Sequence, residues 1–411
     1  MPLSVTEQHR SSERTLIRTA AGVSWRFEHF GAVAYVGDRD DFFAIDQPHA
    51  KLLVIAQQSA GGWVSGTDAD RAATLAALGI VQTTPATPQR AHLGRSLVGD
   101  FVGLPELSAP LVLNCFSTAH CPLRCVYCHA DDLMVPFRDG EGWADMRRVL
   151  STAARVPAMV AVVTGGDPIV APQRAAWLLG RLAGDKRLVL DTSGAGDVGP
   201  LLPALRRHRV HVRVSLDSSD RAVNDRARPI NPRYLPRGTS SSSAAHETLR
   251  RLAQAQVAHS VQTVVGRHND DLDALRRMRD HLLSIGVRHW VLHVAVPAGK
   301  AERRPEVLPG WDVVDRLRTL VAECATAGPL DIRVTGTHRE PNAVLLVDPR
   351  GQLCVQRPHG PGKEVLWADG DTDQAGLLER LRQRVDWAGH ASRYLNGTLE
   401  PAPQRMPALS R

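Results

Sequence analysis

The sequence is poor in cysteine and has no long hydrophobic run. Six cysteines in 411 residues are too few for a disulfide framework, so we expect thiols that are available for metal binding or catalysis. No stretch approaches the roughly 18 consecutive apolar residues of a membrane-spanning helix. The N-terminal segment MPLSVTEQHRSSERT is polar and lacks the apolar core of a signal peptide. We therefore expect a cytoplasmic protein that does not bind a membrane.

Lysine is also scarce, because only four of the 50 Lys and Arg residues are lysine. The formal net charge is +7 and the pI is about 9.4. A basic groove for an acidic peptide or nucleic acid would explain this excess. The favoured explanation is a GC-rich genome that uses arginine as its default surface cation. The motifs described below make nucleic acid the less favoured partner.

Residues 14–95 have the pattern of a small winged-helix-like domain. Alternating apolar residues over 19–46 predict a hairpin or small meander. Helices are predicted over 47–62 and 67–80, and the second begins with a Thr/Asp cap signal and ends at glycine. VQTT at 81–84 follows as a strand, and a linker rich in Pro and Gly comes next.

From about residue 108 the pattern changes to alternating strands and helices. Repeated βα units favour a parallel sheet that closes into a barrel, with ligands at the C-terminal ends of its strands. We therefore expect an α/β fold: a partial (β/α)6 TIM-like barrel over 108–305, followed by a small α+β extension over 306–395. GTSSSS at 238–243 is expected to be a flexible insertion. The six predicted strands are LVLNCF, AMVAVVTGG, RLVLDTSG, HVRVSLDSS, SVQTVVG and HWVLHVAVPAG.

Three cysteines on one short loop, Cys121, Cys125 and Cys128, have the spacing C-x3-C-x2-C. A structural zinc site needs four ligands. The neighbouring His120 and His129 are awkwardly placed to complete one. Three thiolates on one loop fit an iron–sulfur cluster that has one iron without a protein ligand. Such an iron can bind a substrate or cofactor, so the incomplete ligand set itself predicts a functional site.

The segment CPLRCVYC resembles the signature of the radical S-adenosylmethionine (SAM) enzymes. In that family the three cysteines hold a [4Fe–4S] cluster, and the amino and carboxylate groups of SAM bind the fourth iron. Reductive cleavage of SAM gives a 5′-deoxyadenosyl radical that takes a hydrogen atom from the substrate. The resemblance implies that Cys121, Cys125 and Cys128 bind the cluster. It also implies an electron donor such as a flavodoxin or ferredoxin.

Further motifs at strand ends extend the resemblance over about 110–300. TGGDP (164–168) resembles the Gly-Gly-Glu-Pro motif, with Asp in place of Glu. DTSG (191–194) and VSLDS (214–218) match the third-strand and fourth-strand patterns. NDRAR (224–228) resembles the His-Asp-x-x-Arg motif, with Asn in place of His. The resemblance implies that the residues in contact with SAM are Tyr127, Thr164, Gly165, Gly166, Asp167, Ser193, Ser215, Asp217 and Arg228.

The flanking regions point to a peptide substrate. Residues 14–95 resemble the peptide-recognition domain of ribosomal-peptide maturases, which binds a leader peptide as an added strand. A winged helix that binds DNA or only packs on the barrel is the alternative. The C-terminal region resembles a degenerate form of the SPASM/twitch domain, which holds auxiliary clusters. Only Cys115, Cys324 and Cys354 remain for such clusters, so two are excluded and a single one is not favoured.

We therefore expect a radical SAM maturase that modifies a ribosomally made precursor peptide. Cross-linking is the first expectation for the reaction and epimerisation the second. In an epimerase Cys354 or Cys324 could donate a hydrogen atom, although packing as a small hydrophobe is the alternative. Arg228 is expected to hold SAM or a peptide carboxylate. The rival functions are a radical SAM enzyme acting on a small molecule or RNA, and a non-catalytic winged-helix sensor with an iron–sulfur or zinc site.

Overall fold

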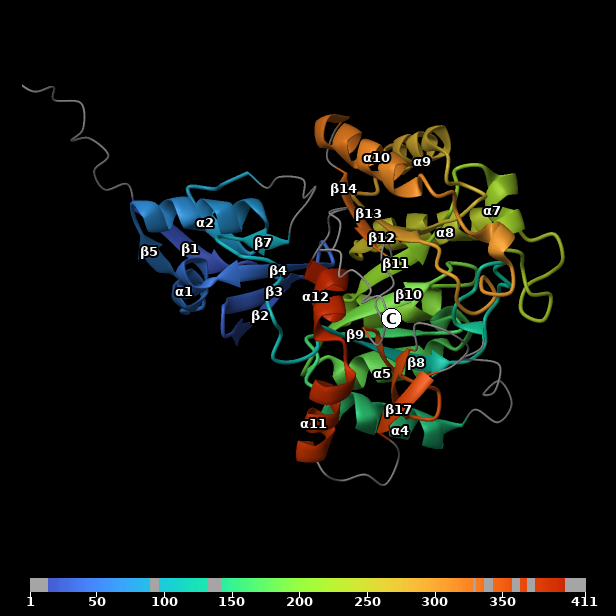
Figure 1. Cartoon of the computed structure of the whole chain (residues 1–411), viewed down its shortest axis with the longest axis horizontal. Coiled ribbons are helices and arrows are strands. Elements are labelled where there is room, and N and C mark those ends of the chain that lie inside the picture. Colours follow the sequence, from blue (N-terminus) through green and yellow to red (C-terminus); the bar gives the residue numbers. More distant parts are fainter. Residues whose placement is uncertain are drawn as a thin grey trace, which may run out of the picture.

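The computed structural model describes residues 14–88, 96–131, 142–327, 330–335, 343–356, 363–367 and 374–395, and everything below refers to these residues (Figure 1). Residues 89–95, at the end of the predicted N-terminal domain, lie outside them. The chain forms a large α/β unit with a smaller N-terminal unit packed beside it. No helix in the described ranges is long and apolar enough to cross a membrane.

One sheet of ten strands forms the framework of the large unit, in the spatial order β14-β13-β12-β11-β10-β9-β8-β15-β16-β17. Neighbouring strands from β14 to β15 are parallel, and β15, β16 and β17 are antiparallel. The six predicted barrel strands are β8 to β13, which confirms the partial (β/α)6 barrel. Their bounds are Val112–Thr118 (β8), Val160–Gly165 (β9), Arg187–Thr192 (β10), His211–Ser215 (β11), His259–Val265 (β12) and His289–Val294 (β13).

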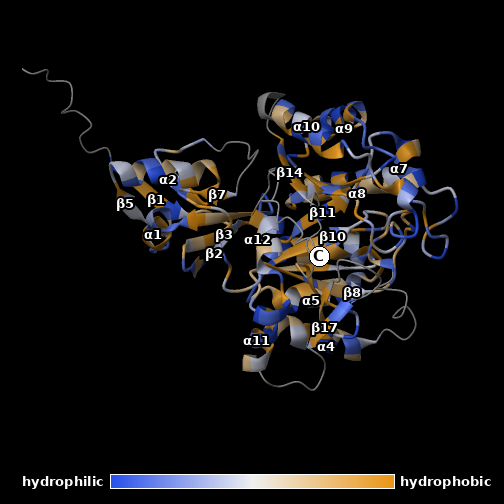
Figure 2. Cartoon of the chain, viewed as in Figure 1, coloured by the Kyte–Doolittle hydropathy of each residue, from blue (hydrophilic) through white to orange (hydrophobic). Residues whose placement is uncertain are grey.

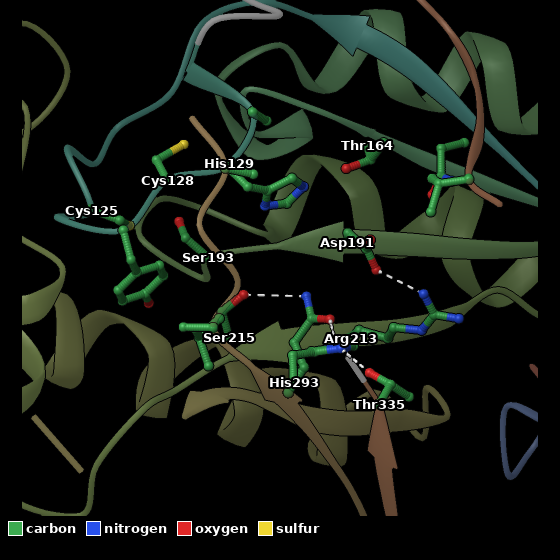
Figure 3. A pocket seen from close by; sticks show the side chains of 18 of the residues that line it. Cys125, Cys128, His129, Thr164, Asp191, Ser193, Arg213, Ser215, His293 and Thr335 are labelled. Atoms are coloured by element: carbon green, nitrogen blue, oxygen red, sulfur yellow. Dashed lines mark hydrogen bonds and ion pairs between the residues drawn. The ribbon is translucent and has the colours of Figure 1, made fainter. Parts of the chain in front are cut away.

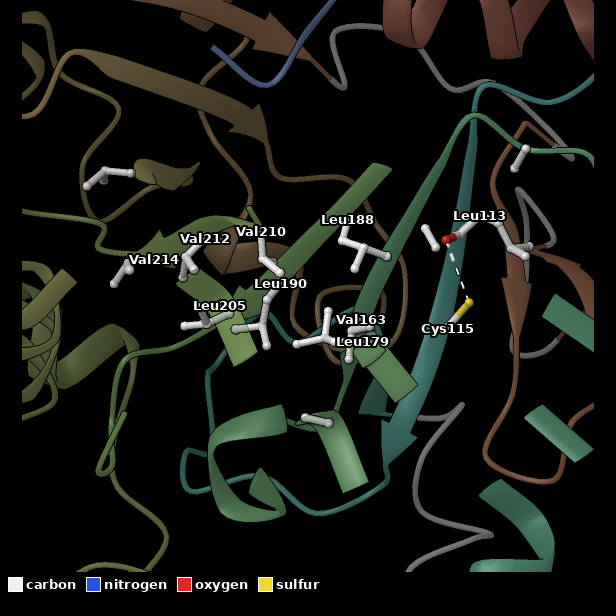
Figure 4. Close-up of a cluster of buried hydrophobic side chains, with 14 of the residues drawn as sticks. Leu113, Cys115, Val163, Leu179, Leu188, Leu190, Leu205, Val210, Val212 and Val214 are labelled. Carbon is white, nitrogen blue, oxygen red and sulfur yellow. Dashed lines mark hydrogen bonds between the residues drawn. The ribbon is translucent and has the colours of Figure 1, made fainter. Parts of the chain in front are cut away.

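Helices cover the outer face of this sheet, because each helix that connects two parallel strands has one apolar face that packs against the sheet. Side chains alternate along each strand, so Val212 and Val214 of β11 face the helices while Arg213 and Ser215 face the barrel interior. Hydrophobic residues accordingly concentrate between the sheet and the helices (Figures 2 and 4). The helices are α4 (Trp143–Arg155), α5 (Pro172–Leu182), α6 (Leu202–Arg207), α7 (Arg221–Ala227), α8 (Ser241–Gln254), α9 (Leu272–Ser284) and α10 (Val313–Ala327).

The serine-rich segment predicted to be a flexible insertion forms the start of α8. The Ser240 hydroxyl caps the helix by accepting from the Ser243 backbone N–H at 3.1 Å. Ser241 donates to Asp225 at 2.9 Å, and both Ser241 and Ser242 are buried. Serine is a preferred N-cap residue. The prediction was wrong because Ser243 and Asp225 provide partners for the Ser240 and Ser241 hydroxyls, which makes a polar run compatible with burial.

The N-terminal unit contains two small sheets and two helices. The predicted meander and the final strand are present, but the first helix ends at Ala56 and the chain then re-enters a sheet as β5. One sheet has the order β2-β3-β4-β7 and the other the order β5-β1-β6. The elements are β1 (Thr15–Thr19), β2 (Val23–Glu28), β3 (Gly31–Val36), β4 (Asp41–Asp46), α1 (Gln47–Ala56), β5 (Gly62–Val64), α2 (Thr67–Ala77), β6 (Val81–Thr84) and β7 (Leu97–Val98).

The turn between β3 and β4 closes the floor of the barrel. Asp40 is only 2% exposed and accepts from Arg213 Nε at 2.6 Å and Nη2 at 3.0 Å. The Tyr35 hydroxyl donates to the same carboxylate at 2.8 Å. Burial alone would raise the pKa of Asp40, but the attraction of Arg213 and His211 lowers it overall. Asp40 is therefore a buried carboxylate that joins the N-terminal unit to β11.

The C-terminal region contributes to both edges of the barrel. β14 (Asp331–Thr335) pairs in parallel with β13, and β15 (Leu345–Val347) pairs in parallel with β8. Two helices end the described region, and Asp386 caps the second of them by accepting from the Gly389 N–H at 2.9 Å. The remaining elements are β16 (Leu353–Gln356), β17 (Lys363–Trp367), α11 (Gln374–Arg384) and α12 (Trp387–Leu395).

Candidate active site

A cavity of about 410 Å³ lies inside the barrel at the C-terminal ends of the strands (Figure 3). The cysteine loop, residues 119–131, covers one side, and Arg393 and Tyr394 of α12 contribute to the wall. All three loop cysteines line it. So does every residue implied to contact SAM except Asp217, which is buried beside the cavity-lining Tyr127. The structure therefore brings the scattered motifs together around one space.

The thiols of Cys121, Cys125 and Cys128 suit a cluster better than a single ion. In the described part of the chain, no three His, Cys, Asp or Glu side chains converge on a metal-ion position. Burial raises the pKa of all three thiols, that of Cys128 to about 12, and Asp167 raises that of Cys121 further. Thiolates here need a strongly positive centre, which the irons of a [4Fe–4S] cluster supply.

Two glycines allow the cysteine loop to approach the end of β9. A Cβ on Gly165 would clash with the carbonyl oxygen of Thr118, and one on Gly166 would clash with that of His120. The backbones are also bonded, since Gly166 N donates to Thr118 O and Asp167 N donates to His120 O, both at 2.7 Å. The close approach of these two backbones explains why the turn is glycine-rich.

The side chain of Asp167 joins the ends of β9 and β10. One carboxylate oxygen accepts from the Thr192 hydroxyl at 2.8 Å, and the other accepts from the backbone N–H of Ser193 at 2.8 Å and from its hydroxyl. Burial raises the pKa of Asp167, and these hydrogen bonds act in the opposite direction. Aspartate in place of glutamate therefore still fulfils a structural role at this turn.

Tyr127 is the centre of a buried polar group behind the cysteine loop. Its ring stacks on His268, with centroids 5.7 Å apart and planes inclined by 8°. The hydroxyl donates to Asp217 and accepts from Arg228 Nη1 at 2.9 Å. Burial acts to raise the pKa of Asp217, but the attraction of Arg228 lowers it overall. Burial acts to lower the pKa of Arg228, but Tyr127 and other neighbours raise it overall. Arg228 thus holds the loop in position, and its catalytic role stays a prediction.

A chain of hydrogen bonds crosses the interior of four neighbouring strands (Figure 3). Gln262 Nε2 donates to Ser215 Oγ at 3.3 Å, and Gln262 Oε1 lies 3.3 Å from His293 Nε2. His293 Nδ1 lies 2.5 Å from the Thr335 hydroxyl. This pattern assigns the ring hydrogen to Nε2. Burial and nearby arginines lower the pKa of His293 well below its ordinary value, so the ring is neutral at pH 7.

The three cysteines outside the loop do not line the cavity. Cys115 and Cys324 lie in the core between the sheet and the helices, and Cys354 packs against Phe116 and Leu346. Burial raises the pKa of Cys115 and Cys354 to about 12 and that of Cys324 to about 11. Cys324 and Cys354 thus pack among apolar residues, and a role for either as a hydrogen-atom donor stays a prediction.

Several residues of the cavity wall were not indicated by the motifs. Arg213 pairs with Asp191 at 3.4 Å, and His293 lies at the end of β13. The alternation of polar and apolar residues along HVRVS could have marked Arg213 as an interior residue. Arg393 and Tyr394 lie on α12, and no local signal in the sequence relates this helix to the barrel.

Comparison with known proteins identifies the class. Residues 116–282 match the radical SAM superfamily. Residues 116–282 therefore form a radical SAM domain, and a domain of this kind supports an enzyme. Radical SAM enzymes use a [4Fe–4S] cluster and SAM, and the residues present fit both: Cys121, Cys125 and Cys128 would hold the cluster, and the surrounding strand ends would hold SAM.

Individual relatives are distant. Over 207 residues the chain is 26% identical to the AdoMet-dependent heme synthase of Methanosarcina barkeri (strain Fusaro / DSM 804). The matched segment makes up 49% of this chain and 55% of the relative. The chain thus spans about half the length of this curated relative. SuiB of Streptococcus suis bound to S-adenosylmethionine has a similar structure, with a TM-score of 0.54 and 11% identity over 85% of both chains. Native anSMEcpe with bound AdoMet has a TM-score of 0.52 and 15% identity over 67% of this chain and 83% of that chain.

Proposed function

We propose that this radical SAM enzyme modifies a ribosomally made precursor peptide at an unactivated C–H bond and that the product is a cross-link. The proposal rests on two features of the same chain. One is the cavity lined by the three-thiol loop, and the other is a groove beside a strand edge of the N-terminal unit. Similar folds support it, because two of the solved structures are SuiB bound to precursor peptide SuiA and anSMEcpe with bound AdoMet and Cp18Cys peptide.

The groove lies on the N-terminal unit between β1, β2 and the end of α1. In the described ranges β2 pairs with no strand but β3, so its outer edge carries no further strand, although the Val23 carbonyl accepts from Arg187 at 2.7 Å. The hydroxyls of Thr19 and Ser24 are buried there without a hydrogen-bond partner among the described residues. A strand edge beside a helix suits an extended peptide that binds as an added strand. The groove is lined by Arg18, Thr19, Val23, Ser24, Trp25, Ala56, Gln57, Gln58 and Ser59.

When bound, the cluster and SAM supply the electron and the radical chemistry that removes a hydrogen atom from the substrate. The chain supplies the geometry. Arg228 and Asp217 hold Tyr127 and with it the cysteine loop. Asp40 and the rest of the β3–β4 turn close the barrel floor and so limit the access of water.

The positions of the thiols favour cross-linking over epimerisation. Epimerisation returns a hydrogen atom to the substrate radical and so needs a donor such as a thiol in the cavity. The three cysteines outside the loop are buried elsewhere, as described above. Cross-linking returns no hydrogen atom, so it does not need such a thiol.

The test uses the anaerobically reconstituted full chain and the small peptides encoded beside its gene. We expect one peptide to bind, to increase formation of 5′-deoxyadenosine and to lose two hydrogen atoms in mass. Ser24→Trp, which fills the groove, should abolish peptide binding measured by fluorescence anisotropy. Gln82→Trp, on the exposed side of β6, is the matched control and should bind normally. Cleavage of SAM without binding or modification of any peptide would contradict the proposal.

A small-molecule substrate is the second candidate. It is favoured by the heme synthase that matches 49% of the chain. Carboxylated tetrapyrroles added to the same assay test it directly, since they would increase 5′-deoxyadenosine in the absence of any peptide and independently of Ser24.

A further inference from the structure

Helix α12 is held against the barrel by a buried histidine. The Leu111 N–H donates to His390 Nε2 at 2.9 Å, so the ring hydrogen lies on Nδ1, which donates to Ala343 O at 2.7 Å. Burial lowers the pKa of His390 to about 4, so the ring stays neutral. Residues three and four positions further along a helix share its face. The same anchor therefore directs Arg393 and Tyr394 towards the barrel, where both line the cavity.

The other arginines of the cavity wall and His293 already have partners, whereas His129, which also lines the wall, makes no hydrogen bond with a described residue. Both ring nitrogens of His293 are engaged by Gln262 and Thr335. Three wall arginines pair with aspartates: Arg213 with Asp40 and Asp191, Arg228 with Asp217, and Arg333 with Asp40 and Asp41.

Arg393 differs from these groups. It is half-buried and makes no hydrogen bond or ion pair with any residue that the structure describes. Its positive charge acts instead on neutral histidines, since it contributes to the lowered pKa of His293 and His390. A cation that is partly removed from water loses solvation free energy unless an anion replaces the water. An anion that enters the cavity would supply this compensation.

We propose that Arg393 binds a carboxylate group of the substrate inside the cavity. The planar guanidinium can bind both oxygens of a carboxylate at once. The cavity extends from Arg393 to the cysteine loop, so a substrate held at one end presents another part of itself to the SAM site. The carboxylate is an acidic side chain or the C-terminus of a peptide, or an acid group of a small molecule. The choice of a peptide rests on the proposed function, whereas the subsite does not.

The first experiment tests the subsite without a known substrate. Phenylglyoxal, which modifies arginine, is applied to the anaerobic holoenzyme with SAM, and modification at Arg393 is followed by mass spectrometry. Succinate is the probe and succinamide its uncharged control. At about ten times its Kd, succinate should slow modification of Arg393 about tenfold, and succinamide should not. Arg207, exposed on α6, is the reference and should be unaffected by either compound. Equal rates at Arg393 with and without saturating succinate would overturn the inference.

The second experiment identifies the source of the carboxylate. In a modified precursor peptide each Asp, Glu and the C-terminus is converted to its amide in turn. One amide should raise KM about tenfold with the unaltered enzyme but less than about twofold with Arg393→Gln, because the pair is already broken. Arg393→Lys should restore part of the difference, and Arg207→Gln should behave as the unaltered enzyme.

The two proposals fail separately. If no peptide is modified but succinate protects Arg393, the peptide function fails and the subsite stands. Amides of tetrapyrrole acids then replace the peptide amides in the comparison of the unaltered enzyme with Arg393→Gln. If a peptide is modified and every amide acts equally with both enzymes, the carboxylate subsite fails and the peptide function stands.

Discussion

Replacing Asp40 with Asn should loosen the N-terminal unit from the barrel floor. The carboxylate is 2% exposed and accepts two hydrogen bonds from Arg213 and one from Tyr35. Asparagine has nearly the same shape but no charge, and its amide nitrogen would face a guanidinium. Loss of one partner of a buried ion pair costs about 3–5 kcal/mol. Asp191, 3.4 Å from Arg213, still neutralises the guanidinium in part. We therefore expect the free energy of local unfolding to fall by about 3 kcal/mol, the lower end of this range.

Hydrogen–deuterium exchange of residues 31–46 measures this loss locally. A cost of about 3 kcal/mol corresponds to exchange more than about 100-fold faster in β3 and β4. Asp197→Asn is the matched control, because Asp197 pairs with Arg251 at the surface and its side chain is 67% exposed. Surface pairs contribute little. Exchange of β3 and β4 in Asp40→Asn within about twofold of the unaltered protein would show that the Asp40–Arg213 pair does not hold these strands in place.

Three further predictions concern the loop and α12. Gly166→Ala should displace the cysteine loop, because the new Cβ meets the carbonyl oxygen of His120, and the iron content after reconstitution should fall; full iron content would contradict this. Tyr127→Phe should lower the free energy of unfolding by about 1–3 kcal/mol, measured with urea, because Asp217 and Arg228 lose a buried partner. The pKa of His390 is about 4 in the folded chain and about 6.5 when unfolded, so the unfolded chain binds more protons between these values. Its stability should fall by up to about 3 kcal/mol as the pH drops from 6.5 to 4, and His390→Gln should flatten this slope; an unchanged slope would exclude His390 as its cause.

The barrel and the meeting of the motif residues around one cavity could be predicted from the sequence because their signals are local. Each strand is a short apolar run, and parallel strands end at one face of a sheet. Motifs that follow successive strands, such as those containing Gly166, Ser193 and Ser215, must therefore meet, and the structure places all three on one cavity. Glycine at position 166 is explained by contact with the loop backbone.

The remaining features depend on contacts between segments that are distant in sequence. Asp40 reads as a turn residue until Arg213 is placed opposite it. Arg393 lies beyond the last recognised motif, and its position depends on the bonds of His390 to Leu111 and Ala343. The serines of α8 were predicted to be a loop because a polar run gives no apolar periodicity, although Asp225 accepts from the Ser241 hydroxyl and the Ser242 N–H. Such pairings leave no pattern within either segment alone.

The most direct test of the account is formation of 5′-deoxyadenosine by the anaerobic protein. The chain is reconstituted with iron and sulfide, and dithionite and SAM are added. We expect about four iron atoms per chain and 5′-deoxyadenosine that disappears in Cys125→Ala. Cys324→Ala, which alters a buried cysteine outside the cavity, should retain both. A preparation that binds zinc but no iron, or equal 5′-deoxyadenosine from Cys125→Ala and the unaltered protein, would contradict a [4Fe–4S] cluster on the cysteine loop.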